Sequence, residues 1–126
     1  MTYFTLLGFS NTIILHIHGG GWVSQSPDQH LSYCSEWAKT SNSPVISVDY
    51  SLSPKAQFPT ALNECFAVYK WLLQPKNTRK LGIFSEDLNV IITGDSAGGN
   101  LTAAVILKVF KFFFILFIFT YPLFNL

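Results

Sequence analysis

Charged residues are scarce in this chain. The 126 residues include 8 Lys and Arg and 7 Asp and Glu, so charged side chains make up 12% of the sequence, against a usual share of about 25%. The net charge of +1 offers no basic surface to a phosphate backbone, which excludes nucleic-acid binding as the function. Hydrophobic residues make up 49%, which excludes an intrinsically disordered chain and indicates one folded domain.

Cysteine is equally rare, and the two that occur, Cys34 and Cys65, lie far apart in the sequence. They have neither the C-x-x-C spacing of a zinc or redox site nor the density of a disulfide scaffold. We expect both to be free thiols on helix faces.

A secretory signal is also missing. Residues 1–10 contain no basic n-region and no small-residue cleavage site, so the sequence predicts a cytoplasmic protein. No internal repeat or low-complexity linker interrupts residues 11–107, which we take as one unit.

Three short runs of β-branched and apolar residues predict buried strands over residues 12–17, 45–48 and 89–93. Between them, apolar residues recur at helical spacing. This predicts one helix that starts near Ser26 and another that starts near Pro59.

Strands that alternate with helices form right-handed βαβ units. The sequence therefore predicts an α/β fold whose short parallel sheet of about three strands is flanked by helices. We expect the strand order second, first, third, which leaves the outer edge of the third strand unpaired.

Residues 94–99 read GDSAGG and contain G-x-S-x-G directly after the third predicted strand. The glycines on both sides of Ser96 permit a tight turn that lifts the hydroxyl away from the carboxyl edge of the sheet. This context predicts Ser96 as a nucleophile. The alternative is a turn that merely connects a strand to a helix.

Residues 18–22 read HGGGW and follow the first predicted strand. Three successive glycines leave their backbone N–H groups unshielded, so these groups can converge on the negatively charged oxygen of a tetrahedral intermediate. The motif predicts an oxyanion hole. The alternative left open is a flexible turn, with His16 or His18 as a core histidine.

In these two motifs the chain resembles the hormone-sensitive-lipase family of α/β-hydrolases, esterases and lipases that act on carboxylic esters. The resemblance covers roughly residues 13–105. It rests on residues 18–22, on residues 94–100, and on a middle block formed by residues 48–54 and 58–62.

The resemblance implies that Ser96 attacks the ester carbonyl and that the amides of Gly20, Gly21 and Ala97 bind the oxyanion. It implies a small-molecule ester or lipid as substrate. No metal or organic cofactor is implied, because serine ester hydrolysis needs only side chains and backbone amides.

The resemblance also implies that His18 and Gly19 hold the glycine loop in shape. The middle block departs from the family pattern, with Ser53 where the family usually has Ala and Lys55 where it usually has Glu.

Two aspartates and one histidine lie close to these motifs. Asp49 and Asp95 follow strand ends that the family uses structurally, so we expect neither to be the triad acid. We expect His30 to be a surface residue near a helix start.

The sequence after Ser96 contains no Asp, no Glu and no His. In α/β-hydrolases an acidic residue and then a histidine follow the nucleophile. We therefore expect a truncated family member, a partial α/β-hydrolase domain over residues 11–107. It would supply the nucleophile and the oxyanion loop but have little or no activity alone.

Residues 108–126 form an apolar C-terminal segment that carries no charge from Phe112 to Phe124. A helix of that length reaches about 20 Å, short of the roughly 30 Å hydrocarbon core of a bilayer. An alternative function left open is a catalytically silent lipid-binding protein. It would associate weakly with a membrane or lipid droplet through this segment.

Overall fold

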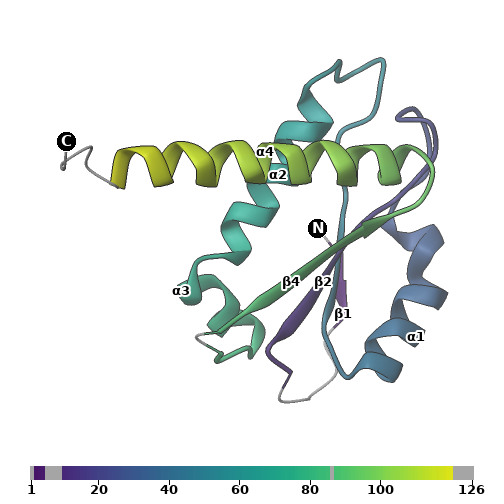
Figure 1. Cartoon of the computed structure of the whole chain (residues 1–126). Helices are drawn as coiled ribbons and strands as arrows, with labels where there is room; N and C mark the ends of the chain where they lie inside the picture. Colours follow the sequence, from purple (N-terminus) through teal and green to yellow (C-terminus); the bar gives the residue numbers. More distant parts are fainter. Residues whose placement is uncertain (1, 5–9, 86, 121–126) are drawn as a thin grey trace.

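The computed structural model describes residues 2–4, 10–85 and 87–120. Within these ranges four strands form one sheet in the order β1-β3-β2-β4, with helices packed against it (Figure 1). Three of the strands are parallel. The predicted α/β fold and its strand order are therefore confirmed.

The parallel part of the sheet consists of the three strands that the sequence predicts. β2 (Thr12–Ile17) is central and pairs with β3 (Val45–Val48) on one side and β4 (Asn89–Gly94) on the other. In the described residues, β4 forms an edge of the sheet and its Ile91 side chain is 53% exposed, so the expected open edge is confirmed.

β1 (Thr2–Phe4) was not predicted. It pairs antiparallel with β3 and lies at the opposite edge of the sheet. Three residues are too few to show a period of two, so sequence alternation gives no signal for such a strand.

The helices follow the predicted alternation with the strands. The first predicted helix begins as a 3₁₀ turn and the second ends before Pro75. The helical elements are η1 (Pro27–His30), α1 (Leu31–Ser41), α2 (Thr60–Leu72), α3 (Pro75–Thr78), η2 (Arg79–Leu81) and α4 (Ala97–Thr120).

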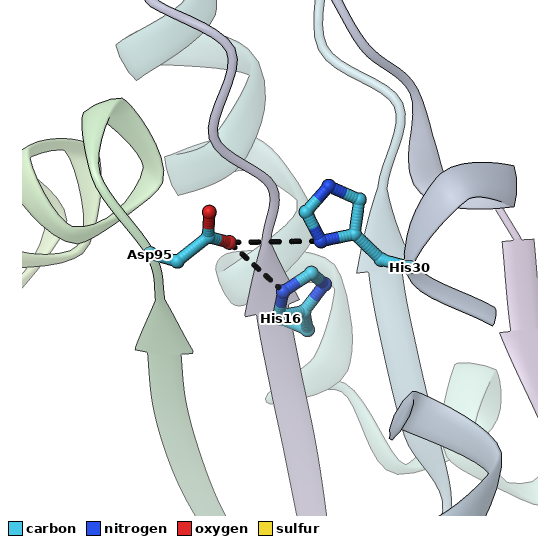
Figure 2. Close-up of side chains that lie close together, drawn as sticks. All are labelled: His16, His30 and Asp95. Carbon is cyan, nitrogen blue, oxygen red and sulfur yellow. Dashed lines mark ion pairs between the residues drawn. The ribbon is translucent and has the colours of Figure 1, made fainter. Parts of the chain in front are cut away.

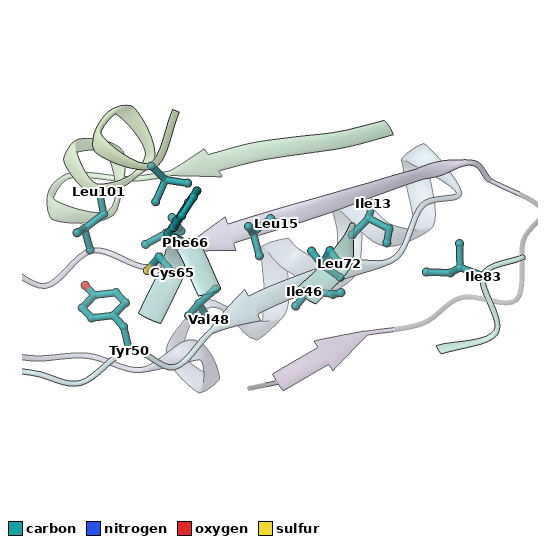
Figure 3. Packing of buried hydrophobic residues seen from close by; sticks show 12 residues of the cluster. Ile13, Leu15, Ile46, Val48, Tyr50, Cys65, Phe66, Leu72, Ile83 and Leu101 are labelled. Atoms are coloured by element: carbon teal, nitrogen blue, oxygen red, sulfur yellow. The ribbon is translucent and has the colours of Figure 1, made fainter. Parts of the chain in front are cut away.

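Two apolar clusters lie on opposite faces of the sheet, because successive residues of a strand point to opposite sides. The larger cluster joins Ile13, Leu15 and Ile17 of β2 to α2 and α4 (Figure 3). The smaller cluster joins Ile14 and Val45 to α1. The sheet is thus covered on both faces, as a parallel sheet requires.

The two cysteines are free thiols on helices, as predicted, and both are buried. Cys34 lies in α1 and Cys65 in α2, one in each apolar cluster. Burial raises the pKa of Cys34 to about 11 and that of Cys65 to about 12, so both thiols are protonated at neutral pH.

The sequence sets residues 108–126 apart as an apolar segment. The backbone shows no break there, because α4 continues across residue 107 to Thr120. Phe, Ile and Leu are compatible with a helix, and residues 108–120 contain no Gly or Pro to end one. The division of the chain at residue 107 stays a prediction.

Phe124 and the rest of residues 121–126 lie outside the described residues. Among the helices that the structure describes, none combines the length and the apolar character needed to cross a bilayer.

Candidate active site

Ser96 lies on a sharp turn between β4 and α4. Its φ is 50°, in the left-handed region that non-glycine residues rarely adopt. The Gly98 amide donates to the Asp95 carbonyl at 2.7 Å, and the Asn100 amide donates to the Ser96 carbonyl at 3.1 Å. A strained turn fixed by the first bonds of a helix is the geometry that G-x-S-x-G requires.

Glycine is required on both sides of this turn by close backbone packing. A Cβ at Gly98 would lie 2.0 Å from the Ile17 carbonyl oxygen, and one at Gly94 would lie 2.5 Å from the same atom. The turn therefore packs directly against the carboxyl end of β2, where the glycine loop begins.

The glycine loop itself contacts the turn that carries Ser96. A Cβ at Gly19 would lie 2.4 Å from Asp95 Oδ2 and 3.0 Å from the Asp95 carbonyl oxygen. Gly20 and Gly21 have φ values of 99° and 63°, which glycine adopts without strain. The two motifs, far apart in the sequence, thus lie side by side.

His18 is buried beneath this loop. Its imidazole stacks on the Tyr50 ring with centroids 4.2 Å apart, and its Nδ1 donates to the Gly19 carbonyl at 2.8 Å. The Tyr50 hydroxyl donates to the His18 carbonyl at 2.8 Å and lies 3.1 Å from the Gly19 carbonyl. Burial lowers the pKa of His18, which favours a neutral ring that holds the loop.

A cavity of about 330 Å³ opens beside the glycine loop. The segment after β3 forms one of its walls and is tied to the loop by a bond of 2.8 Å from the Ser53 amide to the Trp22 carbonyl. The lining is mostly apolar and includes Gly21, Trp22, Phe58, Pro59, Leu62 and Leu101.

A second group of polar side chains, which the sequence analysis did not predict, lies on the α1 side of the sheet. It joins His16 of β2, His30 of η1 and Asp95, the residue before Ser96 (Figure 2). Asp95 Oδ1 lies 3.7 Å from His16 Nε2 and 3.6 Å from His30 Nδ1. The ligand atoms of the three residues lie within 4.8 Å of one another, close enough to hold a metal ion.

The expectation that His30 is a surface residue was wrong, because its side chain is buried. The Tyr33 hydroxyl contacts His30 Nδ1 and lies 3.0 Å from His16 Nε2. His30 comes shortly after the residues that predict a helix start near Ser26. From local sequence alone, a side chain at such a position is expected to be exposed. The strand alternation of β2, which places His16 on the α1 face, is the one sequence signal for this group.

The surroundings make the His16 ring less basic. Burial and the neighbouring His30 together lower the pKa of His16 to about 4, although Asp95 partly opposes both effects. A second cavity, of about 350 Å³, opens over this group.

Comparison with known proteins gives one family and many relatives. A family model described as alpha/beta hydrolase fold matches residues 14–123. Hormone-sensitive lipase of Homo sapiens is 46% identical over 99 residues, 79% of this chain and 9% of the relative. Arylacetamide deacetylase of Bos taurus is 42% identical over 95 residues, 73% of this chain and 23% of the relative.

Solved structures give the same result. A hormone-sensitive lipase from a metagenome library is 38% identical with a TM-score of 0.72. The match covers 86% of this chain and 34% of the solved chain. A carboxyl esterase from the fungus Tuber melanosporum is 32% identical with a TM-score of 0.76 and the same two coverages. The chain spans 9% to 13% of the curated hormone-sensitive lipases that it matches and about a third of these solved chains.

Proposed function

The chain belongs to the α/β-hydrolase fold family, its resemblance to hormone-sensitive lipases is confirmed, and from this premise we propose that it provides half of a serine ester-hydrolase site. That half is the nucleophile Ser96 and the oxyanion-binding loop. The observation that carries the proposal is the packing of Gly19 against Asp95, which holds the glycine loop beside the strained Ser96 turn.

In the proposed reaction, Ser96 Oγ attacks the carbonyl carbon of a carboxylic ester. The carbonyl oxygen becomes negatively charged and accepts hydrogen bonds from the amides of Gly20, Gly21 and Ala97. The proton of the Ser96 hydroxyl passes by way of a general base to the leaving oxygen. The tetrahedral intermediate thereby expels an alcohol and leaves an acyl group on Ser96, which water releases as a carboxylic acid. The chain's own contribution is to position these donors before the reaction begins.

The general base is what these 126 residues lack. No acidic residue or histidine follows Ser96 in the sequence, and the histidines before it are engaged in the contacts described above with Gly19 and Tyr33. Loss of the base from a serine triad costs a factor of about 10⁶ in turnover. We therefore expect the chain alone to hydrolyse esters only slowly.

The cavity of about 330 Å³ supports a small-molecule ester or lipid substrate. Its apolar walls, including Phe58 and Leu62, suit an acyl chain or an apolar alcohol. Relatives named hormone-sensitive lipase and ethyl acetate hydrolase point to carboxylic esters of this kind.

The proposal is tested with the chain alone and with a chimera. In the chimera, residues 12–107 replace the equivalent segment of the metagenomic hormone-sensitive lipase, so that the recipient supplies the acid and the histidine. A short-chain p-nitrophenyl ester should be hydrolysed by the chimera, not by its Ser96→Ala variant, and barely by the chain alone.

Two results would contradict the proposal. A folded chimera without Ser96-dependent turnover would remove the assigned nucleophile. Robust turnover by the chain alone, lost in Ser96→Ala, would show that a base is present and would refute the half-site.

A catalytically silent lipid-binding protein is the second candidate. It is favoured by exposed apolar side chains of α4 beyond residue 111, where Phe112 and Phe113 are 38% and 47% exposed. The full chain and a variant that ends at residue 111 should then differ in sedimentation with phospholipid vesicles. Equal sedimentation of the two would exclude this candidate, and with it the predicted membrane or lipid-droplet association.

A further inference from the structure

Three ligand-type atoms converge beneath the Ser96 turn from three separate parts of the chain. His16 is on β2, His30 is in η1 and Asp95 follows β4 (Figure 2). The distances from Asp95 Oδ1 are 3.7 Å to His16 Nε2 and 3.6 Å to His30 Nδ1. In a tetrahedral site with bonds of 2.0–2.1 Å, ligand atoms lie about 3.3 Å apart. The two distances from Asp95 exceed this spacing by a few tenths of an ångström, and all three ligand atoms lie within 4.8 Å of one another, so binding an ion draws the two histidines together.

Each histidine is held by a second hydrogen bond on its other ring nitrogen. Ser47 Oγ lies 2.8 Å from His16 Nδ1, and Gln25 Oε1 lies 3.0 Å from His30 Nε2. The Gln25 amide oxygen only accepts, so His30 Nε2 carries the proton and the lone pair of Nδ1 faces the Tyr33 hydroxyl. Outer partners of this kind orient the histidines of metal sites. The Tyr33 hydroxyl also lies 3.0 Å from His16 Nε2 and 3.5 Å from Asp95 Oδ1, so an ion bound here displaces it or takes it as the fourth ligand.

The charge and access of the group suit a cation. The group offers one carboxylate and two imidazole nitrogens as ligands, and the Asp95 side chain is 53% exposed. The cavity of about 350 Å³ above the group gives an ion a route from solvent. Two nitrogen ligands and one oxygen favour Zn²⁺ and related transition metals over Mg²⁺ or Ca²⁺, which prefer oxygen.

We propose that His16, His30 and Asp95 form a binding site for a divalent transition-metal ion such as Zn²⁺. The ion ties the centre of the sheet, the start of α1 and the turn before Ser96 together. Its role is structural, because it lies on the α1 face of the sheet and the ester chemistry assigned to Ser96 requires no metal.

The test measures Zn²⁺ binding to the tag-free 126-residue chain after treatment with a chelator. Isothermal titration should give one Zn²⁺ per chain, and the midpoint of thermal unfolding should rise with ZnCl₂ but not with MgCl₂. Asp95→Asn should weaken Zn²⁺ binding at least tenfold, because an amide is a poorer ligand than a carboxylate. The matched control is Asp87→Asn, at an exposed aspartate in the segment between η2 and β4.

Co²⁺ gives an independent readout, since its visible absorption reports the ligands around the ion. The Co²⁺ spectrum of the chain should show the intense bands of a four-coordinate site and lose them in Asp95→Asn. Equal Zn²⁺ affinity in Asp95→Asn and Asp87→Asn, or no saturable binding by the unaltered chain, would overturn the proposal. Because the Asp95 side chain is half-exposed, we expect Asp95→Asn to fold like the unaltered chain. Circular dichroism of the variant checks its fold.

Discussion

Gly98 and Ile17 meet backbone to backbone, which places the first turn of α4 on the end of β2. A Cβ at Gly98 would lie 2.0 Å from the Ile17 carbonyl oxygen, a distance that no rotamer change can relieve. The position of Ser96 relative to the glycine loop depends on this contact.

Gly98→Ala should therefore lower the free energy of unfolding by about 3 kcal/mol, the upper range for overpacking. Gly99→Ala is the matched control, because its Cβ would lie 3.2 Å from the Gly94 carbonyl oxygen. Urea denaturation followed by circular dichroism measures both. Equal losses for the two variants would contradict the close contact at Gly98.

Tyr50→Phe tests the support beneath the glycine loop. The variant keeps the ring stacked on His18 but removes the hydroxyl that donates to the His18 carbonyl. The free energy of unfolding should fall by about 1–2 kcal/mol, because a buried carbonyl loses its donor. Tyr69→Phe, on α2, is the control and should change stability by less. An unchanged free energy of unfolding in Tyr50→Phe would show that the hydroxyl does not stabilise the loop.

Ser96→Gly and Ser96→Ala separate backbone strain from side-chain contacts. At a φ of 50°, a residue with a Cβ carries a cost of about 1 kcal/mol that glycine avoids. Glycine is ordinarily the less stable of the two, but here we expect Ser96→Gly to be about 0.5 kcal/mol more stable than Ser96→Ala. Thermal unfolding of the two variants decides this. A more stable Ala variant would mean that the turn is unstrained.

The stability of the metal-free chain should depend on pH through His16. Its pKa is about 4 in the folded protein and 6.5 in the unfolded one, so the unfolded state binds more protons between these values. Stability should be full above pH 6.5 and fall by up to about 3 kcal/mol as the pH drops towards 4. Urea midpoints at pH 7.5 and pH 5 measure it. An unchanged urea midpoint would show that the His16 ring takes up a proton as readily in the folded state as in the unfolded one.

The parallel strands could be predicted because each is a short, nearly uninterrupted apolar run, as expected of strands covered on both faces. The motif at Ser96 and the glycine run at residues 19–21 could also be placed, since each follows such a run directly. Local sequence is sufficient here because the fold itself puts the ends of parallel strands at one edge.

The polar group around Asp95 could not be predicted in the same way. His30 and Asp95 meet only through the packing of η1 and α1 against the sheet, and nothing in their local sequence links them. The continuation of α4 was missed for a different reason. A uniformly apolar run shows no stripe, although its residues are compatible with a helix.

The two outer strands differ in what they offer a further strand. β1 is three residues long, whereas β4 has six residues and a half-exposed Ile91. A short edge is a poor template for backbone pairing, whereas a longer one presents a full row of N–H and C=O groups. Any polypeptide that extends this sheet should therefore attach alongside β4, on the side where Ser96 emerges.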